Sequence, residues 1–424
     1  MKPLQKPLRA LLSCVLISSA TLQAQDRALI VAAYEEPPVL SATEILKPEY
    51  LSGTNFKVAE SVPTYSGANR YVIESNYGIY HADSNDLLII RVEEIQAIEK
   101  LKNVSRSEEY TKALERAAKS PVALAKNLAK DPVGTVSGVP KGVWKFMNRV
   151  GQSAKEVTSG RERSQYDEGA GKDLIGFSKA KRQVAAQLGI DPYSTNEALQ
   201  RELNGLSWTS FAGNSTVDLL MLPVGGAAKV AYQSVNLTTD TRSMLRDLSP
   251  SDLRRENLGR MIKVGVPKAT GEAFLNGTAF SPWHQTHFID SLLQLDGVTG
   301  RTDFIRTVTA IAENENDALF CQNTAKLMAR IHKNGTRLKR IIIENTFPVC
   351  IAEDGSRILA LQWDYAAWTQ GADQFLTEMQ RGDGKGKPAT CVVAISGVAS
   401  ERAKQELQTR GIRLQERLDP GPLR

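Results

Sequence analysis

The sequence predicts an α+β protein with a small antiparallel β N-terminal part, a helical middle and a small α/β C-terminal domain. Short runs rich in Tyr, Val and Ile occupy residues 70–90. Apolar residues recur at helical spacing through most of residues 176–335, and β-branched runs alternate with helical patterns in residues 336–424. Strands and helices that occupy separate stretches of a chain are typical of the α+β class.

Residues 1–24 have the features of a signal peptide. Three basic side chains precede an apolar run over residues 10–22, and Ala24 supplies the small residue expected before the cut. We therefore expect an exported protein that works in the periplasm or outside the cell. The apolar run is shorter than the roughly 20 residues that cross a bilayer, so the signal does not predict a membrane anchor.

The composition restricts the class of protein. With 42% apolar and 24% charged residues, the chain is too apolar for wholesale disorder and ordinary for a folded protein. Removal of the signal peptide takes away three positive charges and lowers the formal net charge from +6 to +3. This charge excludes a strongly basic nucleic-acid binder, and we expect no nucleic acid among the partners.

Residues 25–102 form an acidic segment that contains the first predicted strands. Residues 25–111 carry fourteen acidic and eight basic side chains. Short runs at residues 70–74, 77–82 and 87–90, separated by turn residues, predict a small antiparallel meander. The apolar spacing that follows predicts one amphipathic helix over residues 91–102.

Residues 103–175 form a basic helical and linker segment. Between residues 112 and 155, nine basic side chains face two acidic ones, and Pro and Gly divide the segment into short pieces. Lys141, Lys145 and Arg149 belong to a short basic amphipathic helix, a pattern with which helices lie on anionic membranes. One hypothesis is therefore peripheral attachment to a membrane surface through residues 141–155. The alternative is neutralisation by the acidic segment within the folded protein.

Residues 176–335 predict a helical domain. Ser178 and Gly189 are suitable start and stop residues for its first helix, and residues 191–194 predict a turn. Apolar spacing predicts further helices near residues 195–206, 216–231, 251–263, 281–295, 302–312 and 315–333.

Residues 336–424 predict an α/β domain. The expected strands are at residues 338–344, 349–352, 357–362, 390–395 and 412–415. A helix that begins after Ser400 and ends at Gly411 connects the last two strands. A crossover of this length predicts that these two strands are parallel.

The histidine cluster at residues 284–290 is the only constellation that suggests catalysis. His284, His287 and Asp290 follow a Ser281 cap and Pro282 at intervals of three, so they share one face of a predicted helix. Two imidazoles and a carboxylate suit zinc, with water completing the ligand set. The alternative, which we favour, is a helix start whose polar residues face solvent.

Three cysteines remain after removal of the signal peptide, at positions 321, 350 and 391. Cys350 and Cys391 fall in two predicted strands of the same domain. In an oxidising compartment they are the candidate pair for a disulfide. Burial of all three as small apolar side chains is the alternative.

The common catalytic signatures are absent from the sequence. It contains no Gly-x-Ser-x-Gly elbow, no phosphate-binding loop and no dinucleotide fingerprint. We therefore expect an exported, non-catalytic binding or interaction protein without a cofactor, whose partner is a protein or an envelope component. The second hypothesis is a metal-dependent hydrolase that uses zinc at His284, His287 and Asp290.

Overall fold

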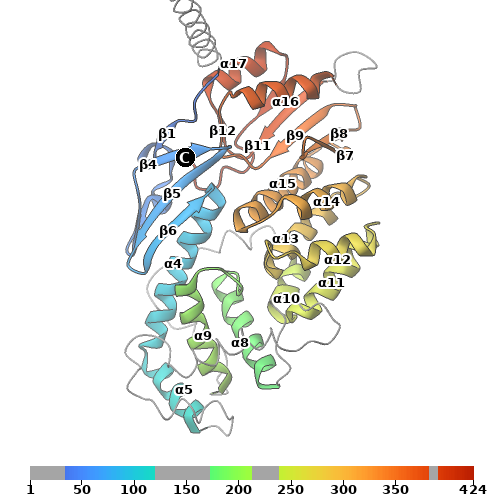
Figure 1. The fold of residues 1–424 in the computed structure, drawn as a ribbon. Helices are drawn as coiled ribbons and strands as arrows, with labels where there is room; N and C mark the ends of the chain where they lie inside the picture. Colours follow the sequence, from blue (N-terminus) through green and yellow to red (C-terminus); the bar gives the residue numbers. More distant parts are fainter. Residues whose placement is uncertain (1–33, 120–171, 213–237, 382–389) are drawn as a thin grey trace, which may run out of the picture.

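The computed structural model describes residues 34–119, 172–212, 238–381 and 390–424 (Figure 1). These residues form an α+β fold with an N-terminal antiparallel sheet, a helical middle and a C-terminal mixed sheet flanked by helices. The fold class predicted from the sequence is therefore confirmed. The predicted signal peptide, the predicted helix at residues 216–231 and the basic helix with Lys141, Lys145 and Arg149 lie outside the described residues.

The N-terminal sheet has the strand order β1-β4-β5-β3-β2, and β6 pairs with the other edge of β5. All of these pairings are antiparallel. Along β5 the buried side chains alternate with more exposed ones, and Tyr71 and Ile73 enter the core. The strands are β1 (Val39–Ser41), β2 (Ser52–Gly53), β3 (Phe56–Val58), β4 (Ser61–Tyr65), β5 (Ala68–Ser75) and β6 (Gly78–Asp83).

The prediction of a third strand at residues 87–90 is wrong, because these residues form the first turns of a helix. Helix α4 (Asn85–Ser105) begins after Ser84, whose side-chain oxygen accepts the N–H of Leu87 at 3.1 Å. Two short helices, α2 (Ala42–Ile45) and α3 (Pro48–Leu51), precede β2.

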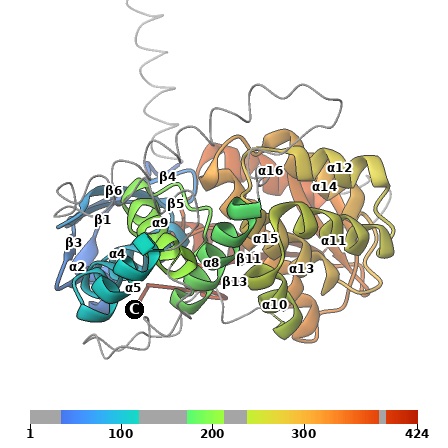
Figure 2. The ribbon, with the colours of Figure 1, turned by 90° about the horizontal axis from the view of Figure 1, so that it is seen from below.

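Helix α4 connects two hydrophobic cores. Its first half, including Leu88 and Ile95, packs with the N-terminal sheet. Its second half, including Ile98 and Leu101, packs with α8 and α9. Figure 2 shows α8 and α9 between α4 on one side and α10 on the other. The helices at this end are α5 (Glu108–Lys119), α8 (Lys172–Leu188) and α9 (Glu197–Ala212).

Helices α11 to α15 pack around the core of the C-terminal sheet, whereas α10 contacts α8 and α13. One core joins Phe274, Phe288, Phe304 and Met328 with apolar side chains of that sheet. The domain boundaries at residues 102, 175 and 335 remain predictions, but the residues between 176 and 335 contribute to more than one core. These helices are α10 (Thr239–Asp247), α11 (Pro250–Lys263), α12 (Lys268–Asn276), α13 (Pro282–Leu293), α14 (Arg301–Ile311) and α15 (Glu315–Lys333).

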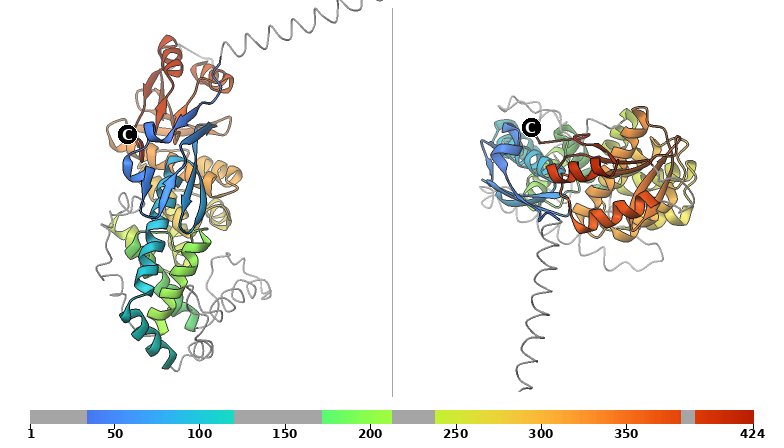
Figure 3. Two further views of the ribbon diagram at one scale, coloured as in Figure 1. Left: turned by 90° about the vertical axis from the view of Figure 1, so that its left-hand side faces the viewer. Right: turned by 90° about the horizontal axis from the view of Figure 1, so that it is seen from above.

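The C-terminal sheet has the strand order β13-β11-β9-β8-β7. Strand β11 is parallel to both β9 and β13, and β7, β8 and β9 are antiparallel neighbours. Helices α16 (Gln370–Arg381) and α17 (Glu401–Thr409) cover the face opposite α13–α15, as Figure 3 shows from above. The strands are β7 (Leu338–Glu344), β8 (Phe347–Ala352), β9 (Arg357–Leu361), β11 (Cys391–Ile395) and β13 (Arg413–Gln415), with a separate parallel pair of β10 (Tyr365–Ala366) and β12 (Val398–Ala399).

The structure does not join Cys350 to Cys391 by a disulfide, and in the described part of the chain Cys321, Cys350 and Cys391 are all buried thiols. Strand β9 separates β8 from β11, which places the two backbones about 9–10 Å apart at ordinary strand spacing. Cys350 also points into the core beneath α13–α15, whereas Cys391 points into the core beneath α16 and α17. Both the distance and the opposite faces prevent a bond.

The end of the chain returns to the N-terminal sheet, as the C label in Figure 1 shows. Leu423 forms a β-bridge with Leu46 and is buried in the N-terminal core. The N–H of Lys47 donates to the carbonyl of Pro422, and the N–H of Arg424 donates to the carbonyl of Ile45, both at 2.9 Å. Segments from opposite ends of the sequence therefore share one core. Among the described helices, none combines the length and apolar character needed to cross a bilayer.

Candidate functional site

Helix α13 carries the three residues that the sequence proposed as metal ligands. It begins after Ser281, whose side-chain oxygen accepts the N–H of His284 at 3.2 Å, with Pro282 in its first turn. His284, His287 and Asp290 are all buried and line the same cavity. The favoured alternative expected these side chains to face solvent, and the structure contradicts it because all three are buried. Each of the three has different hydrogen-bond partners.

Asp290 is held by donors of the protein. Its Oδ1 accepts the Arg260 guanidinium at 2.8 Å and the Thr241 hydroxyl at 2.5 Å, and its Oδ2 accepts the Gln294 side-chain amide at 3.1 Å. Within the described residues, no group of three or more His, Cys, Asp or Glu side chains is arranged to hold a metal ion. The described structure therefore does not arrange His284, His287 and Asp290 as a ligand group, and the Asp290 carboxylate pairs with Arg260 instead.

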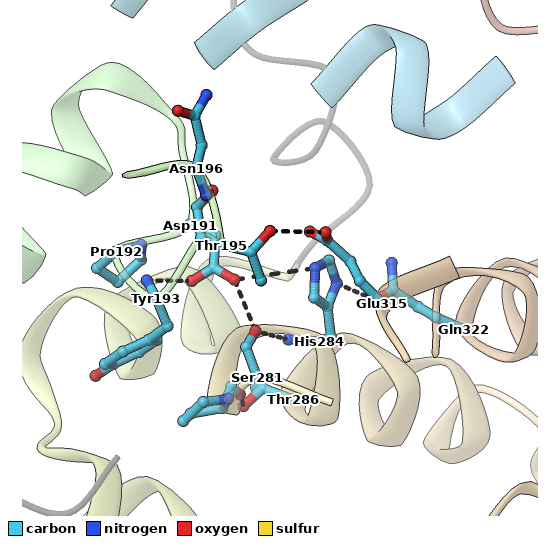
Figure 4. A network of polar contacts seen from close by, with 12 residues as sticks. Asp191, Pro192, Tyr193, Thr195, Asn196, Ser281, His284, Thr286, Glu315 and Gln322 are labelled. Carbon is cyan, nitrogen blue, oxygen red and sulfur yellow. Dashed lines mark hydrogen bonds and ion pairs between the residues drawn. The ribbon is translucent and has the colours of Figure 1, made fainter. Parts of the chain in front are cut away.

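His284 is oriented by two neighbours on different elements. Its Nδ1 lies 2.8 Å from Oε1 of Gln322 on α15, and its Nε2 lies 3.9 Å from Oδ2 of Asp191 (Figure 4). Because an amide oxygen accepts and does not donate, Nδ1 carries a proton. The separation from Asp191 is longer than a hydrogen bond, so that contact is electrostatic.

Asp191 lies in the turn between α8 and α9 and holds the start of α13. Its Oδ2 accepts the Ser281 hydroxyl at 2.6 Å, and its Oδ1 accepts the N–H of Tyr193 at 2.8 Å. Burial raises the pKa of Asp191, and His284 and these hydrogen bonds oppose the rise. A serine, a histidine and an aspartate thus meet, but the serine hydroxyl donates to the aspartate. A nucleophilic serine needs its hydroxyl hydrogen-bonded to a base such as histidine, so this arrangement is structural.

A buried ion network continues from this point toward α4. Arg91 bonds Glu94 at 2.9 Å and Glu315 at 2.6 Å, and the side chains of Arg91 and Glu94 are 10% and 3% exposed. Burial alone lowers the pKa of Arg91, but the two carboxylates raise it above its ordinary value. Thr195 donates to Glu315 at 2.9 Å, and Asn196 donates to Glu94 at 3.0 Å. The network therefore fixes α4, the α8–α9 turn and α15 against one another.

His287 and Trp283 occupy successive turns of α13 and have unsatisfied nitrogens. Their ring centroids are 5.2 Å apart, and both side chains line the cavity. Within the described residues, neither Nε2 of His287 nor Nε1 of Trp283 has a hydrogen-bond partner, although both atoms are buried. Burial lowers the pKa of His287 well below its usual value, and the neighbouring His284 and Lys326 lower it further. The imidazole is therefore neutral near pH 7.

The cavity has a volume of about 560 Å³ and lies between α4, α13 and α15. The apolar side chains that line it are Ile90, Trp283, Leu319 and Ala329. Polar side chains supply much of the remaining wall, and its charged members are Asp86, Asp290, Lys326, Arg330, Lys333 and Asp419. Asp419 comes from the C-terminal tail, so the tail that crosses to the N-terminal sheet also forms one side of the cavity.

The buried acid Asp364 is linked to Asp86 of the cavity lining through the side chain of Gln362. The Gln362 side-chain amide donates to Asp86 at 2.8 Å and to Asp364 at 3.2 Å, so it bridges two acids from opposite ends of the chain. Burial raises the pKa of Asp364 to about 8, with Asp86 adding to the rise and the N–H of Asn69 opposing it. Asp364 therefore holds a proton at neutral pH.

Comparisons with known proteins do not assign this site. No protein-family model, no curated protein and no solved structure matches the chain. The functional argument therefore depends on the geometry of the cavity alone.

Proposed function

We propose that the chain is an exported, non-catalytic binding protein whose ligand is a small polar molecule held in the cavity between α4, α13 and α15. The observation that supports this proposal is the pair of buried nitrogens on Trp283 and His287, which have no partner within the described residues. Buried polar atoms are nearly always hydrogen-bonded, and one left unpaired costs about 1–3 kcal/mol. A polar ligand would supply the missing partners.

The size and lining of the cavity agree with this proposal. Small-molecule sites usually have volumes of roughly 300–1,000 Å³, and this cavity measures about 560 Å³. Amide and hydroxyl groups able to orient a polar ligand come from α13, α15 and the residues that follow α13 and α15. They are Ser291, Gln294, Gln322, Asn323 and Asn334.

The contacts of the potential catalytic groups favour binding over chemistry. The Ser281 hydroxyl donates to Asp191, and the Asp290 carboxylate pairs with Arg260. The role as an exported protein rests on the sequence of residues 1–24. That a protein or an envelope component is a further partner remains part of the proposal.

A thermal denaturation screen of the full chain tests binding in the cavity. The panel contains amino acids, organic acids, polyols and sugars, together with a blocked variant, Asn323→Trp, and a control on α17, Gln408→Trp. Asn323 is half-buried and lines the cavity, whereas Gln408 is exposed and does not. A ligand at 100 times its Kd stabilises by about 2.7 kcal/mol, which raises Tm by a few degrees.

We expect at least one compound to raise Tm in the original chain and in Gln408→Trp, but not in Asn323→Trp. A compound that stabilises Asn323→Trp equally binds elsewhere, and the absence of any stabilising compound would overturn the proposal. Export has a separate test, the intact mass of the protein after secretion. A chain that begins at Gln25 supports export, and retention of residues 1–24 contradicts it.

A further inference from the structure

Helix α15 presents three cations to the cavity. Lys326, Arg330 and Lys333 follow at spacings of four and three, which places them on one face of the helix, and all three line the cavity. Asp419 lies 2.7 Å from the Lys326 ammonium and 3.8 Å from the Arg330 guanidinium. One carboxylate thus faces two cations, and Lys333 extends the row.

The acidic side chains of the cavity do not fully neutralise the positive charge of these three α15 side chains. Asp290 is already neutralised by Arg260, which is outside the lining. Asp86 accepts a hydrogen bond from the neutral amide of Gln362. When Arg260 is counted with its partner Asp290, the described cations at the cavity exceed the three acids Asp86, Asp290 and Asp419 by one positive charge.

The unsatisfied nitrogens specify the chemistry of a ligand more closely. An indole N–H donates and does not accept, so a partner for Trp283 must be an acceptor. Carboxylate and phosphate oxygens are acceptors that also carry the charge that the α15 cations favour. The positive potential of Lys326 reaches the neutral imidazole of His287, where it adds to the lowering of the pKa that burial causes.

We infer that the ligand of this cavity is a small organic anion, with a carboxylate or phosphate group beside Lys326, Arg330 and Lys333 and an acceptor oxygen at the indole N–H of Trp283. This inference rests on the proposed function and adds the class of ligand. Both nitrogens are shielded from solvent in the structure. Binding therefore requires atoms that cover these nitrogens to move aside, which changes the surroundings of the Trp283 indole.

Isothermal titration calorimetry of the full chain with matched probes tests the charge requirement. Succinate and succinamide share a four-carbon skeleton but differ in charge, and inorganic phosphate is the second anion. The cavity variant is Lys333→Gln, and Lys339→Gln on β7 is the matched control because Lys339 is exposed and does not line the cavity. A larger response to succinate identifies a carboxylate site, and a larger response to phosphate identifies a phosphate site.

We expect one anion to bind at least tenfold more tightly than succinamide. Lys333→Gln should weaken the binding of that anion about three- to tenfold, since an exposed charge contributes modestly, and Lys339→Gln should leave its affinity unchanged. Equal binding of succinamide, an unchanged affinity in Lys333→Gln, or no binding of either anion would overturn the inference.

The blocked variant separates this inference from the proposed function. If a neutral compound of the thermal panel loses binding in Asn323→Trp while both anions are inert, the anion inference is wrong and the proposed function stands. If no compound depends on Asn323, both are wrong.

Discussion

The side-chain Oδ2 of Asp364 accepts the backbone N–H of Asn69, 295 positions earlier in the chain, at 3.0 Å. The same oxygen accepts the N–H of Asn85 at the start of α4, at 2.9 Å. One buried side chain from the segment after β9 therefore satisfies donors of the N-terminal sheet and of the helix that leads to the cavity. This contact joins the two sheets.

Replacement of Asp364 should lower the free energy of unfolding, and by more when more of its hydrogen bonds are lost. Asp364→Ala leaves the N–H groups of Asn69 and Asn85 unsatisfied, and we expect the free energy of unfolding to fall by about 2–4 kcal/mol. Asp364→Asn keeps an acceptor oxygen and should lose less. Urea denaturation of the two variants measures the difference, and equal stability of Ala and Asn would contradict the assigned role.

The same carboxyl predicts a pH dependence of stability. Its pKa is about 8 in the folded chain and about 4 when unfolded, so between these values the folded state holds a proton that the unfolded state releases. Stability contributed by Asp364 therefore falls as pH rises from about 4 to about 8, by at most about 1.4 kcal/mol per pH unit. Urea titrations at pH 5, 7 and 9 should show a steeper decline for the original chain than for Asp364→Asn. Parallel curves would contradict the raised pKa.

The buried ion network predicts a large effect at Arg91. Arg91→Ala leaves Glu94 and Glu315 without their cation, and we expect the free energy of unfolding to fall by about 3–5 kcal/mol. Arg70→Ala is the matched control, because the Arg70–Asp83 pair is 48% and 41% exposed and 3.8 Å long. That variant should change stability by less than about 1 kcal/mol. Similar losses in both variants would show that the network does not stabilise the fold.

Two glycines with nearly equal φ angles allow the cost of backbone strain to be measured apart from the cost of a steric clash at Cβ. Gly300 and Gly265 have φ of +84° and +85°. A Cβ at position 300 would lie 1.9 Å from the Ile341 carbonyl oxygen, whereas a Cβ at position 265 would meet no atom within 4 Å. We expect Gly300→Ala to cost about 2–4 kcal/mol and Gly265→Ala about 1–2 kcal/mol. Denaturation midpoints of the two variants provide the comparison, and equal midpoints would contradict the close approach at Ile341.

The cysteines should be unreactive while the chain is folded. Burial raises the pKa of Cys321 and Cys350 to about 12 and also raises the pKa of Cys391. Since the thiolate is the reactive form, none of the three should react with Ellman's reagent until the chain is unfolded. Peptide mapping without reductant should recover Cys350 and Cys391 as separate thiols, and a linked peptide would contradict the strand order.

Much of the fold follows from local patterns in the sequence. Apolar spacing predicted a helix near residues 195–206, and in α9 the side chains of Leu199, Leu203 and Leu206 are buried. β-Branched runs predicted most strands of the C-terminal sheet, including the parallel pair β11 and β13. The apolar run at residues 87–90 fits a strand or a helix, and we predicted the strand. The hydrogen bond from the N–H of Leu87 to the side chain of Ser84 caps a helix at this point.

The candidate site was less accessible to sequence analysis, because its partners come from distant parts of the chain. The spacing of His284, His287 and Asp290 correctly indicates a shared helix but does not reveal Arg260 or Gln322. Asp191 belongs to a segment that the sequence described only as a turn. Arg91 and Glu94, three residues apart within an apolar helix, were the available signal for a buried ion pair.

Trp283 offers the most direct test of the central claim that the cavity binds a small polar ligand. In a sample labelled with ¹⁵N at tryptophan, the indole N–H signal of Trp283 is identified by its loss in Trp283→Phe. We predict that the ligand found in the thermal screen shifts this signal and slows its exchange with water, because Nε1 gains an acceptor. A ligand that binds and shifts other indole signals but leaves Trp283 unchanged would contradict the account.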